Sequence, residues 1–141
     1  MVRDFRETAA QAGREPAALC VRSPGSITIT NEPEKAREQT RGTIAWYIAR
    51  NGVFYYRHLS RLLGEEQIAP IKQAFDEGGA AAGAAAVPNS LVDSMSLATD
   101  SIDRARERLA EQAAAGIDLH QVSVPDRGPR EQQQIFSALC A

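Results

Sequence analysis

The chain has 141 residues, of which 43% are hydrophobic and 24% charged, a composition typical of an ordinary folded domain rather than of a disordered chain. With 16 Lys and Arg against 18 Asp and Glu, the formal charge of −2 excludes a strongly basic nucleic-acid surface and a polybasic membrane patch. No apolar run reaches the ~18–20 residues that cross a bilayer. The amino terminus lacks the apolar core of a secretory signal, so we expect a cytoplasmic protein of one domain.

Cysteine and histidine are too few and too far apart to indicate a metal site. Cys20 and Cys140 have no metal-type spacing, and in a reducing compartment we expect two reduced, partly buried thiols. His58 and His120 have no partner at helical or ligand spacing. The sequence therefore predicts no metal centre, and it offers no nucleophile–base pair or general-base pair either.

The first 50 residues predict a helix, a strand and a second helix. Residues 2–13 are typical of a helix that ends at Gly13. β-Branched residues at 27–30 favour a strand, and Pro24-Gly25 either breaks this strand or precedes it. The second helix opens at Asn31 as N-cap with Glu34 at the capping-box position, and Pro33 fits only its first turn.

The buried face of this second helix follows from helical spacing, and the helix ends at Asn51-Gly52. The residues predicted for that face are Ala36, Thr40, Ile44, Tyr47 and Ile48.

Residues 53–90 predict a helical insertion. "VFYYRHLSRLLG" is typical of a short apolar helix ending at Gly64, and "EEQIAPIKQAFDEGG" predicts another, with a kink or break at Pro70. The stretch "AAAGAAAVP" (80–88) has no strong strand before it, which a glycine-rich phosphate loop requires, so we expect small-residue packing between helices.

Aromatic residues cluster around the start of this insertion. A ligand-stacking role is one interpretation, and helix–helix packing is the favoured one, because the positions fall on helix faces. The cluster consists of Trp46, Tyr47, Tyr55 and Tyr56.

The last third of the chain predicts a short helix or turn after Asn89 and a strand that ends near Ala98 or Thr99. Ser101 is the predicted N-cap of a helix through Ala115, with Asp103 at the positive end of the helix dipole. Gly116 ends that helix; "IDLHQVSVPD" predicts the last strand, and a terminal helix has Pro129 in its first turn. The sheet-facing stripe of the 101–115 helix is expected to hold Ile102, Ala105, Leu109, Ala113 and Gln112.

Strands and helices that alternate in this way predict an α/β fold with parallel strands and right-handed crossovers. Parallel sheets are normally covered by helices on their faces, and three strands are few for this much helix. The pattern therefore indicates part of a larger sheet.

Three stretches of the chain, in this order, resemble the luciferase-like monooxygenases, which are flavin- or deazaflavin-dependent oxidoreductases built on a TIM barrel. The resemblance runs from about Val2 to Leu139 and matches the carboxyl-terminal part of the family. The stretches are "ITITNEPEKAREQTRGTIAWYIARNGVFYYRHLSRLLG", "AAAVPNSLVDSMSLATDS" and "RARERLAEQAAAGIDLHQV".

This resemblance implies a partial TIM barrel made of the last three βα units, with residues 1–141 as one incomplete segment and a helical insertion at about 53–90. A complete barrel has eight strands and typically ~250 residues. The resemblance implies a deazaflavin coenzyme or FMN as cofactor, not bound tightly by this chain alone. The family's residues that face the flavin ring lie mainly in the amino-terminal half, so no catalytic residue is carried over.

Thr99, Asp100 and Ser101 are the candidate cofactor-binding residues, because phosphate in TIM barrels is often bound near the loops after strands seven and eight. A plain helix N-cap at Ser101 is the favoured interpretation. Similar proteins have glycine followed by threonine or serine at this turn, and the carboxylate of Asp100 would repel a phosphate. The other rim positions are Thr30, Asn31 and 123–126.

Two further hypotheses remain open at this stage. An incomplete barrel exposes strand edges, through which a non-catalytic interaction module could form a homo-oligomer or dock on a partner chain that completes the barrel. The chain could also be a fragment without a function of its own.

Overall fold

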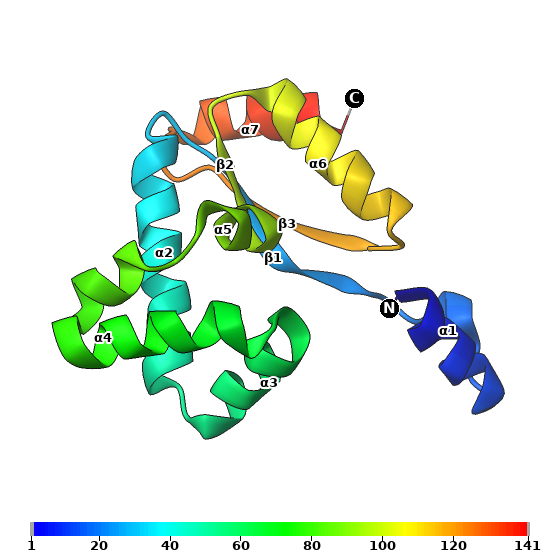
Figure 1. The fold of residues 1–141 in the computed structure, drawn as a ribbon. Helices are drawn as coiled ribbons and strands as arrows, with labels where there is room; N and C mark the ends of the chain where they lie inside the picture. The colour runs from blue at the N-terminus through cyan, green and yellow to red at the C-terminus, as the bar shows by residue number, and fades with distance from the viewer. Residues whose placement is uncertain (1, 141) are drawn as a thin grey trace. The chain divides into compact units, whose positions relative to one another are not determined.

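The computed structural model describes residues 2–140, except the side chain of Pro24 (Figure 1). It divides into two compact units: the sheet unit holds the chain up to Pro33 and from Leu97 onward, and the helical unit holds Glu34–Ser96. The elements are α1 (Val2–Gln11), a 3-10 turn (Pro16–Ala18), β1 (Arg22–Ile29), α2 (Pro33–Arg50), α3 (Val53–Leu63), α4 (Glu65–Ala85), α5 (Asn89–Met95), β2 (Leu97–Thr99), α6 (Ile102–Ala114), β3 (Leu119–Ser123) and α7 (Pro129–Leu139).

The sheet has three parallel strands in the order β2-β1-β3. Ile27 pairs with Leu97 on one side and with Val122 on the other, so β1 donates and accepts along both of its edges. Its ladder with β3 shifts register between Arg22 and Ser26. The strand therefore starts before Pro24-Gly25 and runs through it, and the dipeptide interrupts the pairing rather than marking where the strand begins.

The α/β class with parallel strands is confirmed and is consistent with a partial TIM-barrel-like fold. The strand order is a feature that the sequence does not predict. A barrel of consecutive βα units would place β2 between its two neighbours in the chain, whereas here β1 is central. β1 is the longest strand and carries two isoleucines that are 1% exposed, so burial favours it at the centre.

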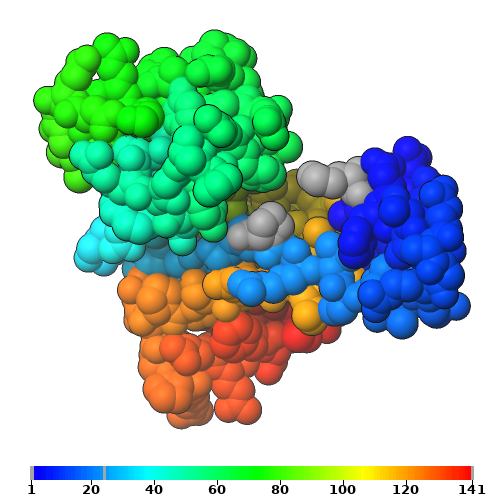
Figure 2. Space-filling model, turned by 90° about the horizontal axis from the view of Figure 1, so that it is seen from below, coloured from blue at the N-terminus to red at the C-terminus, as the bar shows by residue number. Residues whose placement is uncertain are grey.

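One face of the sheet is covered by α6 and α7, which Figure 1 shows side by side. In Figure 2 the orange and red atoms of the chain from β3 to α7 lie directly against the blue atoms of β1. The buried core between these layers consists of Ile27, Ile29, Ala105, Val124 and Ile135.

The opposite face of the sheet is polar. Alternate residues of a strand point to opposite faces, so the residues between the buried isoleucines of β1 lie on this side. The hydroxyl oxygens of Thr28 and Ser123 lie 3.1 Å apart across the β1–β3 pair, and both residues are half-buried. Ser26 and Gln121, which pair one step back along the ladder, continue the same face.

The helical unit has its own core of isoleucine, valine, leucine and phenylalanine side chains from α2, α4 and α5. α3 adds Tyr56, Leu59 and Leu63 to the edge of this core. α4 passes through Pro70 without a break, and its non-helical residue is Gly79, with φ +79° and ψ −169°. That backbone conformation favours glycine. Because α4 passes through Pro70 without a break, the expected kink or break at that residue is wrong.

The alanine-rich stretch 80–88 continues α4 as a helix before turning into α5. A Cβ at Gly83 would lie 2.6 Å from the ring of Phe75, so the two halves of α4 approach each other closely at this residue. Packing of small residues between helical segments is what the sequence predicts for this stretch.

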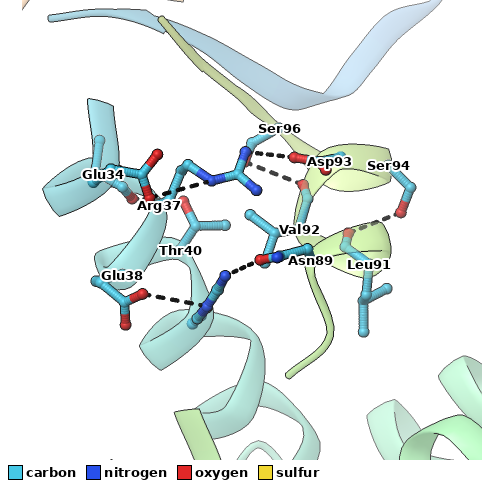
Figure 3. A network of polar contacts seen from close by, with 12 residues as sticks. Glu34, Arg37, Glu38, Thr40, Asn89, Leu91, Val92, Asp93, Ser94 and Ser96 are labelled. Atoms are coloured by element: carbon cyan, nitrogen blue, oxygen red, sulfur yellow. Dashed lines mark hydrogen bonds and ion pairs between the residues drawn. The ribbon is translucent and has the colours of Figure 1, made fainter. Parts of the chain in front are cut away.

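A polar network joins α5 to α2 (Figure 3). Arg37 on α2 donates a hydrogen bond to the carboxylate of Asp93 on α5, and Glu34 flanks the same guanidinium. This hydrogen bond is the largest cause of the raised pKa of Arg37. One turn further along α2, Arg41 donates to the side-chain oxygen of Asn89. The network fixes α5 against α2 beside the apolar core.

Three local expectations differ from the structure. α2 begins at Pro33, so Asn31 lies two residues before the helix and its side-chain oxygen instead accepts a hydrogen bond from Arg127. Tyr47 is 37% exposed, and Ala45, two positions earlier, lies in the core instead. Ala113 is exposed, whereas Gln112 points toward the sheet and donates to Ser23.

The order of the strands is tested by paired cysteines in a Cys20→Ser, Cys140→Ser background. Thr28→Cys with Ser123→Cys should form a disulfide under mild oxidation, because adjacent strands lie ~4.8 Å apart and disulfides span Cα distances of about 4.4–6.8 Å. Ala98→Cys with Ser123→Cys should not, because β1 separates them. Mobility on non-reducing gels measures both, and a crosslink in the second pair alone would show a central β2.

Candidate functional site

The carboxyl ends of the three strands meet at one edge of the sheet, which we call the rim. The backbone N–H of Thr30, directly after β1, donates to the carbonyl oxygen of Thr99 at the end of β2 at 2.9 Å. The hydroxyl of Thr30 donates to the carboxylate of Asp126 in the loop after β3. Thr30 is only 3% exposed. Through these two hydrogen bonds, this buried residue joins the ends of all three strands.

The loop after β3 adds two charged side chains to the rim. The backbone N–H of Asn31 donates to Asp126 at 3.3 Å, and Arg127 donates to the side-chain oxygen of Asn31. Arg127 also pairs with Glu131 on α7 at 3.2 Å. The rim cluster of Thr30, Asn31, Asp126, Arg127 and Glu131 is therefore held by polar contacts between residues nearly 100 positions apart in the sequence.

Thr99, Asp100 and Ser101, the candidate cofactor-binding residues, form the turn from β2 into α6. The Thr99 hydroxyl oxygen accepts from the N–H of Ser101 at 3.0 Å. The Ser101 hydroxyl oxygen accepts from the N–H of Arg104 at 3.2 Å, which is the predicted N-cap of α6. The structure thus brings Thr99 into contact with Thr30, while Ser101 caps its own helix.

The fit of this turn to a phosphate group is poor. The N–H groups of Ser101 and Arg104 are already bonded to side-chain oxygens, so they are not available to an anion. Beside the turn is an open pocket of about 420 Å³, which Asp100 and Glu131 line together with Arg127. Asp100 and Glu131 bring two negative charges to this pocket, and the guanidinium of Arg127 already has partners. The pocket therefore does not favour an anion. The assignment of Thr99, Asp100 and Ser101 to cofactor binding stays a prediction.

Arg127 and Glu131 are the rim residues that the sequence did not single out. Glu131 is recognisable only as an acidic residue in the first turn of α7. The one sequence signal for Arg127 is its place in the loop after the last strand, where barrel folds carry functional groups. Its partners Asn31 and Glu131 come from different elements, and a single sequence does not show such pairs.

A second polar cluster lies at the amino-terminal end of the sheet, around Asp118. The Arg6 side chain on α1 donates to both oxygens of this carboxylate, at 2.8 and 2.6 Å, and the backbone N–H of Val21 donates to it at 2.7 Å. The Val21 hydrogen bond and then the Arg6 guanidinium lower the pKa of Asp118. In barrels this end of the strands serves stability, and these contacts attach α1 to the sheet.

The remaining residues with reactive side chains do not converge on either end of the sheet. Within residues 2–140 no three His, Cys, Asp or Glu residues are arranged to hold a metal ion. His120 pairs through Nδ1 with Gln112 at 2.8 Å. Cys20 and Cys140 are free thiols and both are exposed, so the expectation of partial burial is wrong.

The aromatic cluster lies mostly at the surface of the helical unit. Trp46, Tyr47 and Tyr55 are between 37% and 49% exposed, and their rings contact one another at centroid distances of 5.5 and 5.4 Å. Of the four aromatic residues, Tyr56 packs against the core. None of the helices that the structure describes has the length and apolar character needed to cross a membrane.

The family model described as luciferase-like monooxygenase matches residues 1–119, which include the helical unit, β1, β2 and α6. Searches of curated proteins and of solved structures found no significant match.

Thr30→Val should lower the free energy of unfolding by about 1–2 kcal/mol, because the hydroxyl both donates to Asp126 and accepts from the N–H of Glu32 at 3.1 Å. Urea unfolding followed by circular dichroism measures the change. Thr43→Val is the matched control, since Thr43 is exposed and bonds only to a carbonyl of its own helix. Equal effects of the two substitutions would argue against a structural role for the rim contact.

Asp118→Asn should reduce stability near neutral pH. It should also make stability depend less on pH in the acid range. A carboxylate with a lowered folded-state pKa contributes stability above its unfolded value of about 3.9, and this contribution is lost as the pH falls through the lower folded value. Thermal unfolding between about pH 7 and pH 2 should therefore show a difference between wild type and variant that disappears at the acid end. A constant difference would contradict the assigned pKa direction.

Proposed function

Because the chain belongs to the luciferase-like monooxygenase family, a family of oxidoreductases, we propose that it contributes three βα units to a flavin- or deazaflavin-dependent enzyme. The observation that carries the proposal is the family match, which extends through both compact units. The three parallel strands and their covering helices are consistent with part of the family's barrel.

We assign the chemistry to strands outside these three units. A complete barrel has eight strands, and its active site is assembled from the loops at the carboxyl ends of several of them. The rim here holds three strand ends, and its donors are largely bonded to other residues of the rim. The chain alone should therefore be inactive and should bind neither FMN nor a deazaflavin coenzyme tightly.

A second candidate function is an interaction module that needs no cofactor. The outer edges of β2 and β3 have no neighbouring strand in the described chain, and Leu119 on β3 is 55% exposed. An open edge of a parallel sheet is a template for another strand. A second copy of the chain, or a partner chain that completes the barrel, would cover it.

The cofactor proposal is tested on the purified chain. Its absorption spectrum should show no flavin or deazaflavin band, and titration with FMN or a deazaflavin should give at most weak binding. A cofactor that co-purifies at one per chain would contradict the proposal that this chain alone does not hold the cofactor site. Sequencing the DNA upstream of the codon for Met1 is the complementary test, and we expect it to encode further strand–helix units.

The two candidate functions differ in what light scattering should show. The interaction module predicts a dimer or a complex with the partner chain, while a strictly monomeric, cooperatively folded chain would exclude it. The oxidoreductase proposal would survive that result, because it depends on the family relationship and not on self-association.

A further inference from the structure

The exposed aromatic residues of the helical unit belong to a larger apolar face. The ring of Trp46 contacts that of Tyr47 at a centroid distance of 5.5 Å, and Tyr47 contacts Tyr55 at 5.4 Å. Phe54 is 81% exposed and Leu62 is 57% exposed. Leu62 lies two helical turns beyond Phe54 and Tyr55, so these three side chains share one side of α3. We call the following residues the aromatic face: Trp46, Tyr47, Phe54, Tyr55 and Leu62.

The helix α3 is apolar on two opposite sides. Its inner side carries Tyr56, Leu59 and Leu63, which pack against the core of the helical unit. Its outer side carries Phe54 and Leu62, which are exposed. A helix that is apolar all round is normally buried on all sides. The outer side of α3 therefore indicates a surface that another protein surface covers.

The area of the aromatic face suits one half of a protein–protein interface. Its four aromatic residues are between 37% and 81% exposed, which leaves roughly 300–500 Å² of their surface in contact with solvent. The largest apolar patch on a typical monomer covers about 300–600 Å². Together with Leu62 and the polar residues around it, the face approaches the ~800 Å² that each partner buries in a standard interface.

The residue types of this surface are also those of an interface. Tryptophan, tyrosine, phenylalanine and arginine are enriched in interfaces, and lysine is depleted. Trp46, the single tryptophan of the chain, lies on the aromatic face. Arg57 and Arg61 lie beside it on the exposed side of α3, and the sequence from 44 to 66 contains no lysine.

The charges around the aromatic face indicate which kind of partner fits it. Arg57 and Arg61 on α3 are balanced by Glu65 and Glu66 in the first turn of α4. Such a balance favours neither a nucleic acid, nor an anionic membrane, nor a partner of one charge sign. A second copy of the chain carries the same balanced set, and a two-fold pair brings identical apolar faces together without net repulsion.

We propose that the aromatic face pairs two copies of the chain about a two-fold axis. Phe54, the most exposed of its side chains, anchors the pair against the aromatic rings of the other copy, and Trp46 and Tyr55 become buried. The face belongs to the helical unit, whereas the open edges of β2 and β3 belong to the sheet unit. The pairing therefore goes beyond both candidate functions and depends on neither of them.

Trp46 reports on this pairing, because it is the single tryptophan and it lies on the aromatic face. Sedimentation equilibrium of the full chain should show a monomer–dimer equilibrium. Over the same concentrations, the emission of Trp46 should move to shorter wavelength, and acrylamide should quench it less. A chain that stays monomeric, or a dimer that leaves the emission of Trp46 unchanged, would overturn the proposal.

Phe54→Ser should raise the dissociation constant of the dimer by about tenfold or more, because it removes the proposed anchor. The matched control is Phe5→Ser on α1 of the sheet unit, where Phe5 is 53% exposed, and it should leave the constant unchanged. Circular dichroism checks that each variant folds, and Tyr55→Ser replaces Phe54→Ser if the latter does not fold.

Two further measurements separate this pairing from other ways of covering an apolar surface. Leu119→Ser, on the open edge of β3, should leave the dimer intact. Loss of the dimer in Leu119→Ser but not in Phe54→Ser would assign association to the strand edges and overturn the proposal. A monomer whose Trp46 emission shifts only with phosphatidylcholine vesicles would assign the face to a membrane surface and would also overturn it.

Discussion

The hydrogen-bonded ladders along both edges of β1 are the constraint on which the rest of the sheet unit depends. A strand buried among helices must satisfy its backbone N–H and C=O groups within the protein, and β1 does so against β2 on one side and β3 on the other. Ile27 and Ile29 then present one apolar face to α6 and α7. The same pairing brings Thr30, Thr99 and Asp126 together, so the rim is a direct consequence of strand pairing.

This arrangement also explains how a chain with so few strands forms a compact unit. β1, the longest strand, receives two neighbours, and the free edges fall on β2 and β3, which are short. Short edge strands limit the length of backbone that another strand can pair with.

Local signals in the sequence identified most element boundaries. Gly13, Gly64 and Gly116 end their helices, and Ser101 caps α6, because these effects depend on residues within one turn of the chain. The position of the break in α4, at Gly79 and not at Pro70, was not predictable in this way.

The sequence alone does not predict the long-range features of the structure, for a physical reason. The strand order depends on the total burial of β1, which involves residues more than 90 positions apart. In the site, the turn of Thr99, Asp100 and Ser101 was located from its capping pattern, whereas the contacts of Arg127 with Asn31 and Glu131 arise only after the strands pair.

The hydroxyl-bearing face of the sheet has a consequence for any closed barrel that includes these strands. Barrel interiors are normally filled by branched aliphatic side chains in tight layers. Thr28 and Ser123 would turn hydroxyl groups toward such an interior, and their oxygens lie 3.1 Å apart, so each hydroxyl has the other as a hydrogen-bond partner when bulk solvent is excluded. A cylinder closed over this arc would therefore carry a mutually bonded pair of hydroxyls in a layer that is aliphatic in most members of the fold, and it would need no water between these two side chains.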